Sequence, residues 1–157
     1  MPELTVVVPT FNEAENLAAG VEEVERALAG VDWEVLFVDD DSLDGTAQQA
    51  REIAQVDRRV RCLQRIGRRG LASACIEGML ASSAPYIAVM DGDLQHDPAV
   101  LRAMLATLQG GQTDIVVGSR YVAGGGIGEF SAQRRGISRF ATRLSRAVLK
   151  ADLTDPM

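Results

Sequence analysis

The stretch Tyr86-Ile87-Ala88-Val89-Met90-Asp91-Gly92-Asp93-Leu94-Gln95-His96 joins an apolar run directly to two carboxylates. An apolar run of this length predicts a buried β-strand. Open α/β sheets bind their ligands at the carboxyl ends of the strands, so Asp91 and Asp93 would lie at the ligand-binding edge of such a sheet. In an extended chain these two side chains point to the same side, and Gln95 continues the row.

Asp91, Asp93 and Gln95 therefore form a candidate metal site. Three hard oxygen ligands on one side suit Mg²⁺ or Mn²⁺. Two carboxylates held close together repel each other, and a divalent cation would neutralise them. The alternative is a loop in which Asp97 caps the next helix while the other acids are solvated, and an Asp-x-Asp pattern alone does not decide between the two.

Strands and helices alternate along the chain. Apolar runs predict buried parallel strands at residues 4–8, 33–38, 60–63, 86–90 and 114–118. The first strand would stop at Pro9, and Asn12 and Glu15 would form the capping pair of the helix that follows. Further helices are predicted after the second strand, over Gly70–Ser83 and after Asp97-Pro98. Repeated βα units of this length predict the α/β class, with a mostly parallel sheet and helices on both faces.

Composition limits the number of domains and the cellular compartment. With 157 residues and 46% hydrophobic content, the chain is long enough for one well-packed domain. Cys62 and Cys75 have neither the spacing of a metal site nor the density of a disulfide scaffold, which predicts buried thiols in a reducing compartment. The N-terminus lacks the pattern of a signal peptide and no window has the length of a spanning helix, so we expect a cytoplasmic protein.

Charge is distributed unevenly along the chain. Residues 1–130 hold 20 acids and 10 bases, whereas residues 131–157 hold six bases and two acids. The sequence has neither a high pI nor a series of stacking aromatics, which argues against nucleic acid as a partner. In the basic tail, apolar residues would share one helix face and arginines another: Ile137, Phe140, Leu144 and Val148, against Arg135, Arg139 and Arg143. This pattern favours a membrane surface as a partner, and a terminal helix with a solvated basic face is the alternative.

Three polar loops, residues 9–13, 39–46 and 91–96, follow strands that would lie side by side. A nucleotide needs an aromatic or apolar surface for its base, carboxylates for base edges or ribose hydroxyls, and a cation for its phosphates. Phe11, Asp40 and the Asp91/Asp93 pair would supply these in turn. The spacing within residues 39–46 also favours a helix-capping turn. The two interpretations are compatible, because one aspartate can cap while another binds.

Four motifs together resemble glycosyltransferase family 2. They are Pro9-Thr10-Phe11-Asn12-Glu13, Asp39-Asp40-x-Ser42-x-Asp44-Gly45-Thr46, Asp91-x-Asp93-Leu94-Gln95-His96 and Gly118-Ser119-Arg120-Tyr121. Within that family the chain is similar to the enzymes that transfer sugars to dolichyl or polyprenyl phosphate. The resemblance covers nearly the whole chain and implies the GT-A fold. Residues 1–130 would be the nucleotide-sugar-binding core, and residues 131–157 an incomplete, basic, acceptor- and membrane-proximal segment of the same domain.

The resemblance also implies an activity. It is the inverting transfer of a sugar, first of all mannose from GDP-mannose, to a polyprenyl or dolichyl phosphate, with Mg²⁺ or Mn²⁺ as cofactor. Within the enzyme class, the alternative is a UDP-glucose or UDP-aminosugar donor. A nucleotide-sugar-binding fragment without turnover is the alternative of another class, since the chain stops where relatives continue. The lipid acceptor would place the protein at the cytoplasmic face of the membrane.

Individual roles follow from the resemblance, residue by residue. The nucleotide sugar would be bound by Pro9, Phe11, Glu13, Asp40, Arg68, Gly70 and Asp91; the metal by Asp91, Asp93 and Gln95; and the acceptor phosphate by Arg120, Arg134 and Ser138. Asp93, Arg120 and Asp155 would be the catalytic residues. A phosphate monoester is already largely ionised near neutral pH, because its second pKa is about 6. No strong general base is then needed, so a polar loop position is favoured for His96, with a general-base role as the alternative.

Overall fold

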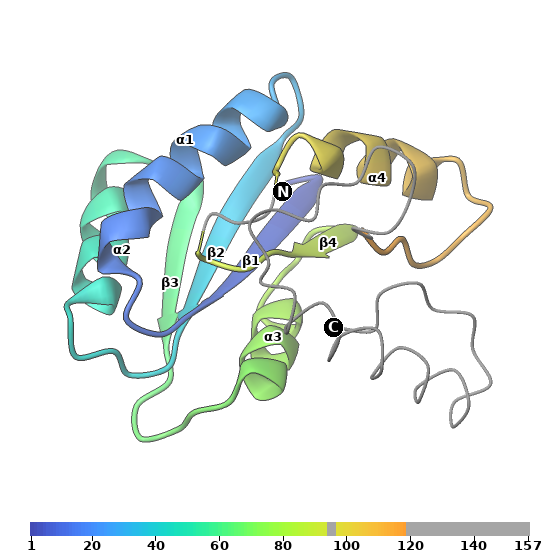
Figure 1. Ribbon diagram of the computed structural model, residues 1–157. Coiled ribbons are helices and arrows are strands. Elements are labelled where there is room, and N and C mark those ends of the chain that lie inside the picture. The colour runs from blue at the N-terminus through green and yellow to red at the C-terminus, as the bar shows by residue number, and fades with distance from the viewer. Residues whose placement is uncertain (94–96, 119–157) are drawn as a thin grey trace, which may run out of the picture. The chain divides into compact units, whose positions relative to one another are not determined.

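The computed structural model describes residues 1–93 and 97–118 of the chain (Figure 1). The chain divides into two compact units, Met1–Asp114 and Ile115–Met157, and every described helix and strand lies in the first. The elements in order are β1 (Leu4–Thr10), η1 (Ala14–Asn16), α1 (Leu17–Ala27), β2 (Trp33–Asp39), α2 (Thr46–Val56), β3 (Val60–Gln64), α3 (Leu71–Leu80), β4 (Tyr86–Val89) and α4 (Val100–Gln109).

The four strands form one parallel sheet in the order β3-β2-β1-β4. All their carboxyl ends therefore lie at the same edge, and the predicted α/β class is confirmed. The strand predicted at residues 114–118 is wrong, because these residues form no strand. A strand needs a neighbour to satisfy its backbone N–H and C=O groups, so an apolar run alone is not sufficient to make one.

The core lies on both faces of the sheet (Figure 1). Side chains alternate along β1, so Val6 and Val8 pack in one core cluster and Val7 in the other. The first cluster receives side chains from α1, α2 and α4. The second receives Ala74 of α3. Three helices thus cover one face and α3 covers the other, which confirms the predicted two-sided arrangement.

β1 runs through Pro9, which was predicted to end it. The Val7 carbonyl accepts the Met90 N–H (3.0 Å) on the β4 side, and the Thr10 carbonyl accepts the Asp40 N–H (3.0 Å) on the β2 side. Along a strand the backbone groups of successive residues point alternately to its two neighbouring strands. Pro9, two residues after Val7, therefore has its backbone nitrogen on the β4 side. The last paired residue of β4 is Val89, opposite Val7, so Pro9 lacks an N–H only where β4 pairing has already stopped.

A side chain holds the turn that leads into α4. In the turn before α4 the Asp97 carboxylate accepts the N–H of Ala99 (2.9 Å), as the predicted cap requires. The helix then ends immediately before Gly110. Considering residues 1–93 and 97–118 only, none of the helices combines the length and the hydropathy needed to cross a membrane.

Helix α3 packs very closely on the sheet at Gly78. A Cβ atom added there would overlap Val7 Cγ1 and would lie 2.9 Å from Val38 Cγ2. Both valines are fully buried in strands, so neither can move aside without disturbing the core. This contact explains why a helix interior carries a glycine.

We expect Gly78→Ala to lower the free energy of unfolding by about 1–3 kcal/mol, because overpacking outweighs the better helix propensity of alanine. Urea unfolding followed by circular dichroism measures the effect. Leu80→Ala is the control, since Leu80 belongs to the same helix but is 80% exposed, and its replacement should change stability by less than about 0.5 kcal/mol. Equal stability of Gly78→Ala and the wild type would contradict the close packing.

Candidate functional site

Each of the four strands leads into the candidate site at the carboxyl edge of the sheet. Phe11 directly follows β1, Asp40 follows β2, and Arg65 follows β3. Asp91 comes two residues after the end of β4. Because β2, β1 and β4 are neighbours in the sheet, the three loops predicted to converge do begin at one edge, the position where open α/β sheets bind ligands.

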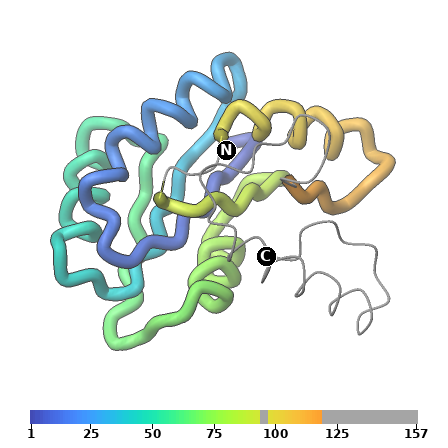
Figure 2. The backbone as a smooth tube through the Cα atoms, in the orientation of Figure 1, coloured from blue at the N-terminus to red at the C-terminus, as the bar shows by residue number. Residues whose placement is uncertain are grey.

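The loop after β1 is fastened to the turn after β2, and the two run close together in Figure 2. The bonds that join them include Asn12 N–H to Ser42 Oγ (2.9 Å), Leu43 N–H to Asn12 Oδ1 (3.2 Å) and Ala14 N–H to Asp44 Oδ2 (3.0 Å). The capping pair predicted from Asn12 and Glu15 is therefore wrong. Asn12 has a φ of 58°, a left-handed conformation that Asn tolerates, and its side chain holds the neighbouring turn.

The turn before α2 is closed by its own side chains. Asp39 Oδ2 accepts the Ser42 N–H (3.0 Å), and Asp44 Oδ1 accepts the N–H of Thr46 (3.0 Å), the first residue of α2. Burial acts to raise the pKa of Asp44, but hydrogen bonds from the Thr46 side chain and from the Ala14 and Thr46 backbone outweigh it and lower that pKa. Asp44 thus holds the first N–H of α2, as the predicted capping turn requires, while Asp39 closes the turn before it. Neither bond uses Asp40, which leaves that residue for another role.

Asp40 is held in a buried ion pair. Its Oδ1 accepts a hydrogen bond from Arg65 Nη1, and its Oδ2 accepts the Gly70 N–H (2.6 Å). Asp40 is only 6% exposed and Arg65 2%. A carboxylate has about four acceptor positions, so these two bonds fix its orientation and leave acceptor capacity for a ligand.

Arg65 is a site residue that the sequence analysis missed. The third strand was predicted to end at Leu63, and an arginine soon after a strand is usually solvated. The available signal was its position, since Arg65 follows a strand at the same edge as Asp40. Asp41, the residue after Asp40, holds the turn between β3 and α3. It accepts hydrogen bonds from Gln64 Nε2 (3.1 Å) and from the Gly67 N–H (3.2 Å).

The turn between β3 and α3 also contacts Phe11. The Phe11 ring is 45% exposed, and the Arg69 guanidinium carbon lies 4.4 Å from its centroid, within cation–π range. Arg68, which was predicted to bind donor phosphates, donates to Glu77 Oε1 (2.8 Å). The structure thus brings the Phe11 side chain to this turn, and Gly70 of the turn to Asp40.

Two further predicted donor-binding residues lie near the carboxyl end of β1, one within the strand and one in the loop after it. Pro9 is buried within the strand. Glu13 is half-buried, its N–H donates to Thr46 Oγ1 (3.0 Å), and its Oε2 accepts from Asn16 Nδ2 (2.6 Å). These two bonds hold Glu13 where the loop after β1 meets the start of α2.

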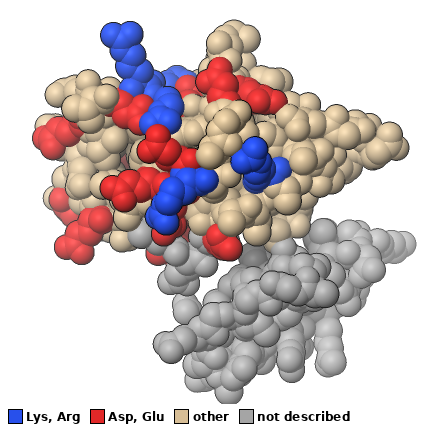
Figure 3. All heavy atoms as spheres, turned by 90° about the horizontal axis from the view of Figure 1, so that it is seen from above, with Lys and Arg blue, Asp and Glu red and all other residues tan. Residues whose placement is uncertain are grey.

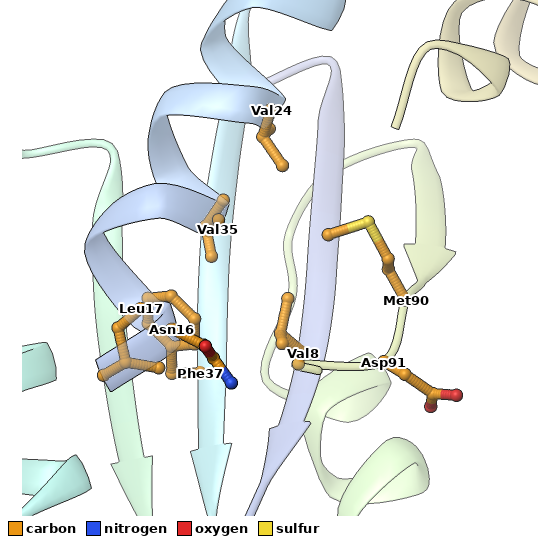
Figure 4. Close-up of a pocket in the computed structure, with 10 residues that line it drawn as sticks. Val8, Asn16, Leu17, Val24, Val35, Phe37, Met90 and Asp91 are labelled. Carbon is orange, nitrogen blue, oxygen red and sulfur yellow. The ribbon is translucent and has the colours of Figure 1, made fainter. Parts of the chain in front are cut away.

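Asp91 and Asp93 are exposed after the end of β4. In Figure 4 the Asp91 carboxylate points away from the mostly apolar hollow that Met90 and Val8 help to line. Burial raises the pKa of the Cys75 thiol on α3, and the negative charges of Asp91 and Asp40 raise it further. The charges of Asp91 and Asp40 thus both reach Cys75 on α3.

The Asp91 and Asp93 carboxylates fit a divalent cation of the Mg²⁺ type. Such ions are commonly bound by one or two carboxylates together with substrate phosphates, and two exposed carboxylates at a ligand-binding edge offer that arrangement. Within residues 1–93 and 97–118, no group of three or more His, Cys, Asp or Glu side chains is placed to hold a metal alone. The remaining predicted site residues lie outside the described residues: Gln95, Arg120, Arg134, Ser138 and Asp155.

Charges of both signs are interspersed on the face shown in Figure 3. Ion pairs among the described residues include that of Arg59, whose Nη2 lies 2.8 Å from both Glu25 Oε1 and Asp57 Oδ2. The hydrogen bond from Arg59 lowers the pKa of Asp57. Among the described residues, this face presents no basic stripe of the kind that nucleic-acid-binding proteins use.

Comparison with known proteins gives close relatives for this arrangement. The chain is 37% identical over 157 residues to a dolichol-phosphate mannosyltransferase from Pyrococcus furiosus, and the alignment covers 99% of this chain and 44% of the relative. It is 33% identical over 163 residues to a dolichol-phosphate mannosyltransferase from Mycosarcoma maydis, covering 99% of this chain and 54% of the relative. The chain thus spans about half the length of these curated relatives.

Solved structures share the fold. A mannosyltransferase from Pyrobaculum calidifontis in complex with GDP-Man and Mn²⁺ matches with a TM-score of 0.52 and 27% identity, over 59% of this chain and 28% of that one. A glucosyl-3-phosphoglycerate synthase from Mycobacterium tuberculosis matches with a TM-score of 0.67 and 18% identity, over 99% of this chain and 53% of that one. At that identity the second likeness concerns the fold alone, and it confirms the predicted GT-A architecture.

Sequence comparison with whole families agrees with these pairwise matches. The family model described as "Glycosyl transferase family 2" matches residues 5–156. The match includes all three loops of the candidate site and nearly the whole chain. This chain therefore belongs to glycosyl transferase family 2.

Proposed function

We propose that this protein is a glycosyltransferase that transfers a sugar from a nucleotide diphosphate donor to a polyprenyl or dolichyl phosphate. The observation that carries the proposal is the convergence of Phe11, Asp40 and Asp91 at one edge of the sheet, in a chain 37% and 33% identical to two dolichol-phosphate mannosyltransferases. The names of these relatives favour mannose as the sugar, and the similar mannosyltransferase in complex with GDP-Man favours GDP-mannose as the donor.

The donor would bind across the carboxyl ends of β1, β2 and β4. The exposed ring of Phe11 offers a stacking surface for the base. The Asp40 carboxylate, fixed by Arg65 and Gly70, would accept hydrogen bonds from an N–H of the base or a ribose hydroxyl. Arg69, which stacks on Phe11, would add a positive charge at the rim of the same site.

The diphosphate would lie at Asp91 and Asp93. These two carboxylates would hold Mg²⁺ or Mn²⁺, a cation that stabilises the negative charge developing on the β-phosphate as the glycosidic bond breaks. The exposed position of both side chains leaves room for phosphate oxygens beside them. Metal dependence is thus part of the proposal.

The acceptor phosphate would attack the anomeric carbon directly, with inversion. Since its second pKa is about 6, this nucleophile is ionised near neutral pH and needs no strong base. Arginine side chains position phosphates well, and we propose this role for Arg120 and Arg134, with Ser138 beside them and Asp155 near the reacting centre. A lipid-bound acceptor implies that the protein works at the cytoplasmic face of a membrane, with the basic segment 131–157 towards the lipid.

Thermal stability in the presence of candidate donors tests the proposal. GDP-mannose, UDP-glucose and UDP-N-acetylglucosamine are each compared with and without Mn²⁺, because a ligand at about 100 times its Kd stabilises the folded state by roughly 2.7 kcal/mol. We expect stabilisation by GDP-mannose only when Mn²⁺ is present. Stabilisation by a UDP-sugar alone would make that sugar nucleotide the donor in place of GDP-mannose. No response to any donor would contradict the proposed function.

A further inference from the structure

Asp40 is held by an arginine that is itself held by Glu77. Glu77 Oε1 accepts hydrogen bonds from Arg65 Nε (3.2 Å) and from Arg68 Nη1 (2.8 Å). Arg65 is 2% exposed, so it does not reach a ligand at the surface of the site. Arg65 therefore acts on a bound nucleotide through the residues it holds, and among these Asp40 is the proposed nucleoside ligand.

Glu77 controls the plane of the Arg65 guanidinium. The guanidinium is rigid and planar, so a carboxylate that fixes Nε also fixes the direction in which Nη1 points. Arg65 Nη1 donates both to Asp40 Oδ1 and to the Gly70 carbonyl (3.2 Å). The Gly70 N–H in turn donates to Asp40 Oδ2 (2.6 Å). Both oxygens of Asp40 thus depend on the geometry that Glu77 sets.

We propose that Glu77 is a positioning residue for nucleoside recognition, acting through Arg65 on the orientation of Asp40. This rests on the proposed function, in which Asp40 binds the nucleoside of the donor. Glu77 lies on α3 and is not a ligand itself. Its effect is confined to the nucleoside, because the diphosphate is assigned to Asp91 and Asp93.

The chain offers a matched control for Glu77. At the opposite end of β3, Arg61 Nη1 donates to Glu34 Oε1 (3.1 Å), and Arg61 Nη2 donates to the Ala81 carbonyl (3.2 Å). This pair also joins an arginine in or next to β3 to a carboxylate, but Glu34 lies on β2 and Arg61 lies before the carboxyl edge of the sheet. Glu34→Gln weakens the same kind of bond without touching the site.

The test measures the affinities of GDP, UDP and inorganic pyrophosphate, each with Mn²⁺, by calorimetry on the wild type, Glu77→Gln and Glu34→Gln. Glutamine keeps the size and one acceptor oxygen but binds a guanidinium less strongly than a carboxylate does. We expect Glu77→Gln to weaken binding of the preferred nucleoside diphosphate about tenfold, the size of effect seen when a residue that orients a ligand-binding group is removed. Pyrophosphate affinity should stay unchanged, and Glu34→Gln should bind all three ligands as the wild type does.

The outcomes separate this inference from the function on which it rests. Wild-type affinity of Glu77→Gln for the nucleoside diphosphate would overturn the role of Glu77 alone. Equal losses in Glu77→Gln and Glu34→Gln, or an equal loss for pyrophosphate, would overturn it as well, because either result marks a general structural effect. A wild type that binds neither GDP nor UDP would overturn the proposed function and the role of Glu77 with it.

Discussion

Asp93→Ala is expected to abolish metal-dependent donor binding while leaving the fold intact. Asp93 is exposed just beyond β4, and the proposal makes it one of two carboxylates that hold the cation. The cation's electrostatic stabilisation is worth several kcal/mol, so the Mn²⁺-dependent part of GDP-mannose affinity should fall by roughly 100-fold or more. Stability should change by less than about 0.5 kcal/mol, because an exposed aspartate is removed.

Asp32→Ala is the matched control for this change. Asp32 is also an exposed aspartate beside a strand, but it precedes β2 and so lies at the amino end of the sheet, away from the site. Calorimetric titration of GDP-mannose, with and without Mn²⁺, compares the two variants with the wild type. Asp32→Ala should behave as the wild type does, and an Asp93→Ala protein that keeps its full Mn²⁺ dependence would remove the metal site from the proposal.

The sheet could be predicted from the sequence because its central strands are short, nearly continuous apolar runs. Trp33–Asp39 is buried at every position, and such a run has few alternatives to a central parallel strand. The prediction failed at 114–118, where a similar apolar run forms no strand among the described residues. Whether an apolar run becomes a strand depends on a partner strand, and a local pattern does not contain that information.

The candidate site could be predicted only in part, for a related reason. The positions of Phe11, Asp40 and Asp91 follow from strand ends, which the sequence marks clearly. The partners of their side chains depend on contacts between loops that are distant in the sequence: Asn12 bonds to a turn 30 residues away, and Arg65 to an aspartate 25 residues away. Spacing within one loop predicted a local cap for Asn12, and nothing local distinguishes a buried arginine from a solvated one.

Arg65→Met is expected to lower the free energy of unfolding by about 3–5 kcal/mol, the cost of leaving one partner of a buried ion pair without the other. Only 9% of the Asp40 side chain is exposed, so water compensates little for the lost guanidinium. Arg68→Met is the control, since Arg68 shares the partner Glu77 but its side chain is 59% exposed, and exposed pairs contribute about 1 kcal/mol or less. Urea unfolding of both variants measures the difference.

A double variant shows whether the pair itself is responsible. If the cost of Arg65→Met comes from the stranded charge of Asp40, then the same change should cost less when Asp40→Asn has already removed that charge. The free energies of unfolding of the wild type, the two single variants and the double variant give this coupling directly, and we expect it to exceed about 1 kcal/mol. Additive costs would mean that Arg65 stabilises the fold through its bonds to Ser73, Gly70 and Glu77, and that Asp40 owes its orientation to the Gly70 N–H alone.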